Sequence, residues 1–270
     1  MDNVEKFYDH LLLKGYEKIT IENYKRVLSK FLRETQKPNR ERAESYLIEM
    51  RKKDYSYSHI KSTITAVKRY MEFIGRPIKT EMPRRPTTLP VKEILTEGEI
   101  ARMFATTKNN REKAMLAILA YCGLRNKEVC QLKVKDIDLD NNLVKVIGGK
   151  FNKDRVVPMS RECSKIIINY LNDYPRNSPL FTTLKEEKQY NGSALRKRIK
   201  VIAKRAKIGK RVYPHLFRHS FISHLIERGA NIVAVQQFAG HSNISTTMLY
   251  THLSPKKIFQ EYQYYMPSYQ

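Results

Sequence analysis

The chain has 270 residues, and its 51 Lys and Arg residues against 27 Asp and Glu residues give a formal net charge of +24. This length suggests one large or two ordinary domains with room for a sizeable core. The sequence contains no apolar run that could span a bilayer and no N-terminal signal peptide, so a membrane partner is disfavoured. The positive charge is spread along both halves, and we therefore expect a folded protein that binds nucleic acid over much of its surface.

The three cysteines indicate a reducing compartment. Cys122, Cys130 and Cys163 have neither metal-ligand nor redox spacing, and a disulfide framework is not expected at this cysteine density. We predict three buried thiols in a cytoplasmic protein.

The N-terminal part, residues 1–83, is predicted to be a helical bundle. Short helices are expected over Val4–Lys14 and Arg40–Lys52, and two longer helices are indicated by apolar residues at helical spacing. These residues are Tyr24, Val27, Leu28, Phe31 and Leu32 in one helix, and Ile60, Ile64, Val67, Met71 and Ile74 in the other. The opposite faces are basic and either solvated or DNA-binding. The overall charge favours DNA contacts by four residues of these faces, Lys25, Arg26, Lys61 and Lys68.

A domain linker is predicted over residues 84–94, because residues 82–90 contain three prolines. Proline removes a backbone donor and disfavours helix before it. Arg84 and Arg85 make this linker basic, and we expect it to lie along a phosphate backbone. Thr96 and Glu99 then match a capping box, which predicts the start of a new helix.

The second domain, residues 95–270, is predicted to be mixed, so the fold class is an all-α N-terminal bundle followed by an α+β domain. Short strands are indicated over Ile137–Leu139, Leu143–Ile147 and Arg155–Pro158, with turn residues between them. Helices are expected over Arg111–Tyr121, Arg161–Leu171, Ser193–Ala206, Leu216–Arg228, Ile232–Phe238 and Thr246–Tyr250.

No metal site is predicted. Asp136, Asp138 and Asp140 imitate the start of a calcium loop, but Asn141 and Ile147 stand where such a loop needs Gly and Glu. No other clustered set of ligand residues is visible in the sequence.

Three separated segments combine residue types that suit chemistry at a phosphodiester: Gly123-Leu124-Arg125-Asn126-Lys127-Glu128, His215-Leu216-Phe217-Arg218-His219, and Gly240-His241 followed nine residues later by Tyr250. Phosphoryl transfer passes through a state with extra negative charge, and Arg presents a rigid pair of donors that matches two phosphate oxygens. Arg125 and Arg218 are therefore suited to bind the non-bridging oxygens. His215 lies three residues before Arg218, on the same face of a helix, and His241 can supply a further hydrogen bond.

In order and spacing, these segments and the intervening Gly149-Lys150-Phe151-Asn152-Lys153-Asp154-Arg155 resemble the tyrosine recombinase and integrase family, especially its Xer branch with the archaeal XerA-like enzymes. The resemblance covers Leu95 to Leu253. It implies a SAM-like helical core-binding domain and a catalytic domain of the DNA breaking-rejoining type. The N-terminal part matches the core-binding domain only in size, charge and helical character. A member of this family is a DNA strand transferase that needs neither metal nor cofactor.

The resemblance assigns roles to the candidate residues. Tyr250 would be the nucleophile that becomes linked to the 3′-phosphate of the cut strand, and His215 would act as its general base. Arg125, Arg218 and His241 would bind the phosphate.

Lys150 would act as the general acid on the leaving 5′-oxygen, since burial beside cations lowers the pKa of a lysine. The family usually shows glycine where this chain has Phe151, and Gly148 is an extra residue, so Lys153 remains an alternative to Lys150. Glu128 is expected to orient Arg125, and His219 is expected to be a supporting residue.

The last segment, residues 254–270, is predicted to dock on a protein surface. Pro255 should end the helix that contains Tyr250, and an apolar stripe then follows, made of Ile258, Phe259, Tyr262 and Tyr265. The stripe packs either on its own domain or, as the resemblance favours, on a neighbouring subunit.

The function that the resemblance implies is site-specific recombination of the Xer type. By analogy with the family, four protomers would act on two DNA sites and resolve chromosome or plasmid dimers, which serves chromosome partition before cell division. The compact length, without an additional N-terminal DNA-binding domain, favours this role over DNA integration by an integrase or excisionase of a mobile element or virus. A non-catalytic architectural DNA-binding protein is the alternative of another class. The retained Tyr250, His215 and two arginines argue against it.

Overall fold

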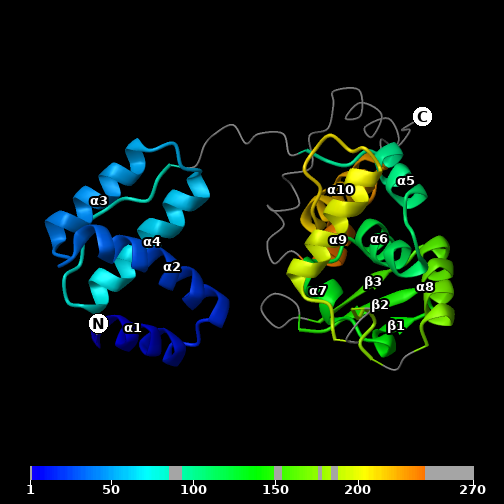
Figure 1. The fold of residues 1–270 in the computed structure, drawn as a ribbon, viewed down its shortest axis with the longest axis horizontal. Coiled ribbons are helices and arrows are strands. Elements are labelled where there is room, and N and C mark those ends of the chain that lie inside the picture. Colours follow the sequence, from blue (N-terminus) through cyan, green and yellow to red (C-terminus); the bar gives the residue numbers. More distant parts are fainter. Residues whose placement is uncertain (1, 85–92, 149–153, 176–177, 184–187, 241–270) are drawn as a thin grey trace, which may run out of the picture. The chain divides into compact units, whose positions relative to one another are not determined.

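The protein is described from a computed structural model, which covers residues 2–84, 93–148, 154–175, 178–183 and 188–240 (Figure 1). The chain divides into two compact units, Met1–Pro90 and Val91–Gln270. The boundary falls among residues outside the described ranges, so the linker predicted over residues 84–94 stays a prediction. Within the described ranges, no helix has the length and apolar character of a membrane-crossing span.

The first unit consists of helices α1 (Asp2–Leu13), α2 (Lys18–Thr35), α3 (Arg40–Lys52) and α4 (Tyr57–Phe73). The predicted apolar stripes form its core. Leu28 and Phe31 of α2 and Val67 and Met71 of α4 are fully buried, while the ends of both stripes are half-buried. Since α4 packs on both α2 and α3, the unit is a helical bundle, as predicted.

The second unit contains the following elements in chain order: α5 (Glu97–Ala105), α6 (Asn110–Cys122), α7 (Asn126–Gln131), a 3-10 turn (Val134–Asp136), β1 (Ile137–Asp138), β2 (Leu143–Val146), β3 (Arg155–Pro158), α8 (Arg161–Asp173), α9 (Gly192–Arg205), α10 (Pro214–Glu227) and α11 (Ile232–Ala239). The strands form one antiparallel sheet in the order β1-β2-β3. This helical domain with a small sheet confirms the predicted α+β class.

Helix α6 is the centre of this domain and packs against α8 and α10 (Figure 1). It is apolar on nearly all sides, as expected of a helix that is covered all round. The two charged residues of its first turn are also buried. Arg111 donates to the Thr182 carbonyl at 3.1 Å, and Glu112 pairs with Arg198 and Arg205, so both buried groups have hydrogen-bond partners.

The predicted capping box is confirmed at the start of α5. The Thr96 hydroxyl accepts from the Glu99 backbone at 3.2 Å, and the Glu99 carboxylate accepts from the Thr96 backbone at 2.8 Å. The three cysteines are free and buried, as predicted.

The acidic residues near β1 stabilise local turns. Asp136 accepts from the Lys133 backbone at 2.8 Å, and Asp138 accepts from the Asn141 backbone at 3.0 Å. Among the residues with described positions, no group of three or more His, Cys, Asp or Glu is arranged to hold a metal ion.

The main correction to the predicted elements is α7, a helix of six residues that the apolar pattern did not reveal. One turn and a half is too short for a helical period to emerge. The first two predicted strands are one residue shorter than expected. The helix expected over Thr246–Tyr250 lies outside the described residues.

Gly123 makes the turn between α6 and the Arg125 segment, and it provides a test of local stability. Its φ is +58°, and an added Cβ would lie 2.3 Å from Cδ1 of Phe221. Gly229 also has a positive φ, +83°, but open space around it. We expect Gly229→Ala to lower the free energy of unfolding by about 1–2 kcal/mol, from backbone strain alone. Gly123→Ala should lower it by about twice as much or more, because the new methyl group also clashes with the Phe221 ring.

Urea unfolding followed by circular dichroism measures both losses. Gly209→Ala serves as a control, because Gly209 has neither a positive φ nor a neighbour within 4 Å. Equal losses for Gly123→Ala and Gly229→Ala would show that the Phe221 ring does not constrain this turn.

Candidate active site

Arg125 stands at the start of α7, where the chain turns after α6. Its backbone N–H donates to Oε2 of Glu128 at 2.7 Å, and its Nη1 donates to Oε1 of the same carboxylate at 2.8 Å. Glu128 is the third residue of α7, so one carboxylate both caps the helix and fixes the arginine side chain. Glu128 thus contacts Arg125 directly, and its role in orienting a catalytic arginine stays a prediction.

Glu128 also binds a second arginine, Arg155 of β3. Nη1 and Nη2 of Arg155 donate to Oε1 and Oε2 at 2.8 and 2.9 Å, a bidentate pair. The side chains of Glu128 and Arg155 are 6% and 10% exposed, so the pair is largely shielded from water. With four donors on its two oxygens, the carboxylate joins α7 to the β2–β3 hairpin.

The ionisation of Glu128 follows from these contacts. Burial alone would raise the pKa of this carboxyl group, but the hydrogen bonds and positive charges of Arg155 and Arg125 outweigh burial and lower the pKa from 4.5 to about 2. Glu128 is therefore a fixed negative charge at neutral pH and not a proton donor.

Arg218 lies in α10, which begins at Pro214. This arginine is 1% exposed, and it donates from Nη1 to the Gly123 carbonyl at 2.9 Å. His215, one turn earlier, is exposed, and its ring centroid lies 4.6 Å from that of His219. The Gly123 bond ties α10 to the turn that precedes Arg125.

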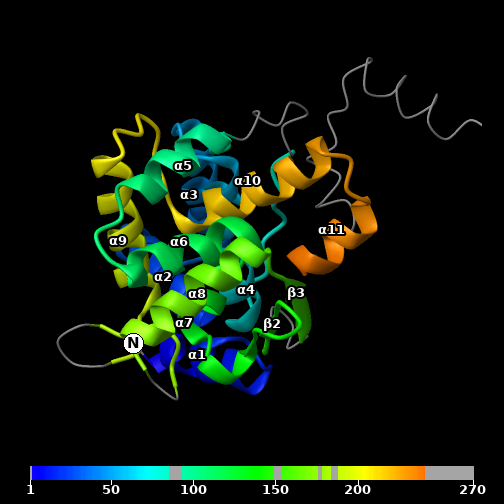
Figure 2. The ribbon, with the colours of Figure 1, turned by 90° about the vertical axis from the view of Figure 1, so that its right-hand side faces the viewer.

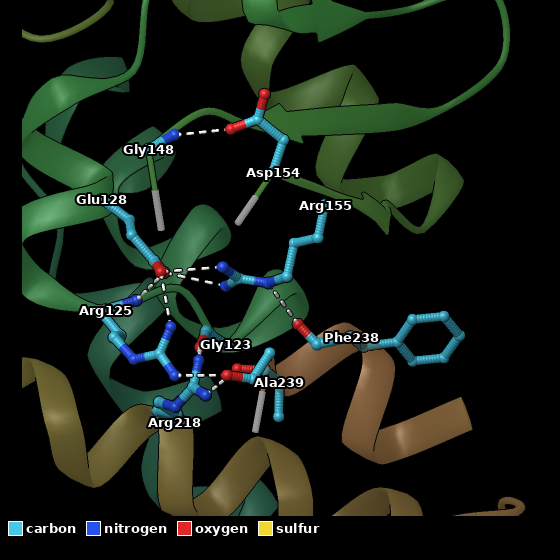
Figure 3. A network of polar contacts seen from close by, with 10 residues as sticks. Gly123, Arg125, Glu128, Gly148, Asp154, Arg155, Arg218, Phe238 and Ala239 are labelled. Carbon is cyan, nitrogen blue, oxygen red and sulfur yellow. Dashed lines mark hydrogen bonds and ion pairs between the residues drawn. The ribbon is translucent and has the colours of Figure 1, made fainter. Parts of the chain in front are cut away.

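The C-terminal end of α11 brings the arginines together (Figure 3). Three consecutive backbone carbonyls each accept from a different arginine. Arg155 Nε donates to Phe238 at 2.9 Å, Arg218 Nη2 donates to Ala239, and Arg125 Nη2 donates to Gly240 at 2.8 Å. Because consecutive Cα atoms are about 3.8 Å apart, the three guanidinium groups are close neighbours.

This arrangement has a physical reason in the helix itself. The last carbonyls of a helix have no partner within the helix and carry a partial negative charge, so they attract cations. Three guanidinium groups lie at the end of α11, and the Glu128 carboxylate pairs with two of them, Arg125 and Arg155, which leaves an excess of positive charge there. A fixed cluster of this kind is suited to bind an anion such as a phosphate group.

Three of the predicted catalytic residues, Lys150, His241 and Tyr250, lie outside the described residues. For His241 the structure describes the residue that precedes it, and for Lys150 it describes the chain on both sides of the segment. Gly240 immediately precedes His241 and accepts from Arg125. The segment that contains Lys150 lies between Gly148 and Asp154, which are joined by a hydrogen bond of 2.8 Å from the Gly148 backbone to the Asp154 carboxylate.

The predicted DNA-binding residues differ in their surroundings. Arg26, Lys61 and Arg84 are exposed. The amine of Lys25 lies 4.9 Å from the centroid of the Tyr8 ring and 3.7 Å from the Glu22 carboxylate, so it already has partners within its own unit.

Lys68 is half-buried and donates to the Thr80 carbonyl at 2.9 Å, so it also has a role within its own unit. Arg85 lies outside the described residues. The contacts of these lysines and arginines with DNA stay predictions.

Arg155 is the residue of the site that sequence reasoning missed. It was visible only as the last residue of the Lys150 segment. The strand pattern held a signal, because Arg155 shares a strand face with Val157, which is fully buried. An arginine on the buried face of a strand requires an anionic partner.

Comparisons with known proteins find related sequences over most of the chain. Residues 93–257 match the model of the phage integrase family. The chain is 35% identical over 262 residues to the tyrosine recombinase XerA of Pyrococcus horikoshii, which covers 95% of this chain and 91% of that protein. It is 36% identical over 203 residues to the tyrosine recombinase XerD of Staphylococcus haemolyticus, covering 69% of this chain and 66% of that protein.

Solved structures are similar over the full length. A crystal structure of XerA recombinase has a TM-score of 0.58 at 29% identity and covers 100% of both chains. The Tn1549 transposon integrase in complex with circular intermediate DNA has a TM-score of 0.76 at 20% identity, covering 97% of this chain and 99% of that one. At 20% identity, this second likeness concerns the fold alone.

The lowered pKa of Glu128 predicts how stability depends on pH. A carboxylate whose folded pKa lies below its unfolded value stabilises the fold above pH 4.5, and this contribution is lost as the pH falls towards 2. We expect Glu128→Gln to lower the free energy of unfolding by about 3–5 kcal/mol at pH 7, because the largely shielded Arg155 and the partly exposed Arg125 both lose their counter-charge. The deficit should shrink by about 3 kcal/mol between pH 4.5 and 2.

Urea unfolding of both proteins at several pH values measures this difference, and other carboxylates cancel in the comparison. A deficit that stays constant from pH 7 to 2 would contradict the assignment of Glu128 as the ionised partner of both arginines.

Proposed function

Because the chain belongs to the phage integrase family and is a tyrosine recombinase, we propose that it recombines specific sites in double-stranded DNA and resolves chromosome or plasmid dimers in the cytoplasm. The observation that carries the proposal is the match to XerA of Pyrococcus horikoshii over nearly the whole of both chains. The net charge of +24 supports an extended contact with DNA.

The proposed reaction is a transesterification. The Tyr250 hydroxyl attacks the phosphorus of one backbone phosphate, the bond from tyrosine to phosphorus forms, and the bond to the 5′-oxygen breaks. His215 takes the tyrosine proton, and Lys150 or Lys153 protonates the leaving oxygen. A 5′-hydroxyl from the partner strand then attacks the 3′-phosphotyrosine and releases Tyr250.

Arg125 and Arg218 would bind the two non-bridging oxygens during both steps. Their positions at neighbouring carbonyls of α11 support this role, since both charges are held before the substrate arrives. Preorganised donors of this kind stabilise developing charge without reorganisation, and removal of one such donor typically costs about 10²–10³ in rate. His241 directly follows the carbonyl bound by Arg125 and would supply a further donor.

We further propose that four protomers act together on two sites and that residues 254–270 dock on a neighbouring protomer. The catalytic domain offers a groove of about 790 Å³ for this segment. Apolar residues such as Ile100, Phe104 and Phe221 line it together with charged residues such as Glu97 and Arg228. The apolar stripe of the C-terminal segment is complementary to these apolar residues.

An integrase of a mobile element would use the same chemistry, and the fold of the Tn1549 integrase is compatible with it. The two roles differ in where the DNA sites lie. Mapping of the genomic sequences that become covalently attached to the protein separates a single chromosomal site from the ends of a mobile element.

A nicked substrate that traps the covalent intermediate tests the enzymatic proposal. We expect a protein–DNA adduct with the wild-type chain and a loss of roughly 10⁴-fold or more with Tyr250→Phe, because no other group replaces the nucleophile. Tyr174→Phe is the matched control among the 17 tyrosines and should leave adduct formation unchanged. Adduct formation by Tyr250→Phe would refute the assignment, and its absence with the wild-type chain on every cognate site would favour a DNA-binding module.

Truncation after Ser254 tests the docking proposal. We expect strand exchange between two sites to fall by about tenfold or more while DNA binding persists, because loss of an apolar anchor weakens the assembly. Ala101→Glu should have the same effect, since Ala101 is exposed and lines the groove, whereas Ala101→Ser should not. Full strand exchange by the truncated protein would refute the proposal.

A further inference from the structure

Arg155 occupies an unusual position in the sheet. It pairs with Val146 of β2, and next to that pair Val144 lies opposite Val157. The three valines are buried, so Arg155 continues the inward face of the hairpin. Burial of a charged side chain on such a face is costly unless the charge is paired and hydrogen-bonded.

The guanidinium group of Arg155 connects three parts of the chain. Both terminal nitrogens donate to Glu128, which is 27 residues away in sequence, and Nε donates to the carbonyl of Phe238, which is 83 residues away. Figure 3 shows the group between α7 and the end of α11. All three nitrogen atoms of the guanidinium are therefore engaged with protein groups.

Arg155 also packs against the backbone at Gly240, which has a φ of +60°. A Cβ on this glycine would lie 3.0 Å from Cδ and 3.1 Å from Nε of Arg155. The side chain thus fits closely against the residue that ends α11 and precedes His241. Movement of Arg155 would release that residue as well as Glu128.

We propose that Arg155 is a positioning residue, which fixes Arg125 through Glu128 and fixes the start of the His241 segment through the end of α11. This inference rests on the proposed catalytic roles of Arg125 and His241. We assign Arg155 this supporting role because all three nitrogen atoms of its guanidinium donate to Glu128 and Phe238. Its position at the first residue of β3 also anchors the hairpin whose connecting segment contains Lys150.

The geometry explains why lysine would be a poor substitute. A bidentate pair with Glu128 and a third bond to Phe238 require a planar group with donors in three directions. A lysine amine provides the positive charge but not the planar set of donors that the two partners require. Arg155→Lys should therefore retain part of the function, whereas Arg155→Met should retain less.

Single-turnover cleavage of the nicked substrate at saturating DNA tests this inference. We expect the cleavage rate to fall by about 100-fold in Arg155→Met, since a misplacement of about 1 Å can cost that much, with Arg155→Lys in between. The dissociation constant for DNA should change by less than about threefold, because Arg155 does not contact the DNA in this proposal. A loss of 1.4 kcal/mol in binding free energy would instead weaken binding roughly tenfold. Arg102→Met is the control, because it removes the same charge from an exposed position on α5.

A double-mutant cycle separates positioning from a general loss of structure. Because one of the two proposed routes from Arg155 runs through Glu128, the combination of Arg155→Met with Glu128→Gln should lose clearly less cleavage rate than the product of the two single losses. Multiplication of the two effects would overturn the proposal, as would cleavage by Arg155→Met at the wild-type rate.

Hydrogen exchange measured by mass spectrometry reports how strongly Arg155 stabilises the end of α11, independently of any cleavage assay. Exchange at the last turn of α11 should become faster in Arg155→Met and Arg155→Lys and stay unchanged in Arg102→Met. Unchanged exchange in both Arg155 variants would overturn the proposal even if cleavage falls. Absence of cleavage by the wild-type chain would count against the proposed function, and exchange would still decide the role of Arg155.

Discussion

Three guanidinium groups and one carboxylate meet at the C-terminal end of α11, and the geometry of the catalytic domain depends on this charge cluster. Arg125, Arg155 and Arg218 would repel one another in a poorly hydrated site. Glu128 and the last carbonyls of α11 offset that repulsion with one full and several partial negative charges. The cluster joins α7 and β3 to the consecutive helices α10 and α11, which follow much later in the chain.

This constraint links stability to function. A site that concentrates positive charge for a phosphate must remain folded before the phosphate arrives, and the structure achieves this with internal anions. Glu128 is suited to the task because its pKa is lowered to about 2, so the carboxylate stays ionised at neutral pH. Arg218 is almost fully buried and Arg125 is partly exposed, so the two proposed phosphate ligands are held with different rigidity. Hydrogen bonds from neighbouring residues hold the side chains that contact a substrate in their productive geometry.

The sequence was informative where one local pattern determines one element. Helical spacing identified α2 and α4, the capping box of Thr96 and Glu99 identified the start of α5, and strand patterns located the hairpin. The pairing of Glu128 with Arg155 could not be foreseen, because it depends on how α7 and β3 pack and not on either segment alone. The same holds for the three carbonyls of α11, since backbone acceptors leave no trace in residue type.

The central claim is that Arg125 and Arg218 neutralise the non-bridging oxygens of one phosphate. A substrate with an uncharged methylphosphonate at the cleavage position tests it most directly. If the arginines act on that charge, Arg125→Ala and Arg218→Ala should each lose much less cleavage on the neutral substrate than on the normal phosphate. Equal losses on both substrates would contradict the account and would mean that the two arginines only support the fold.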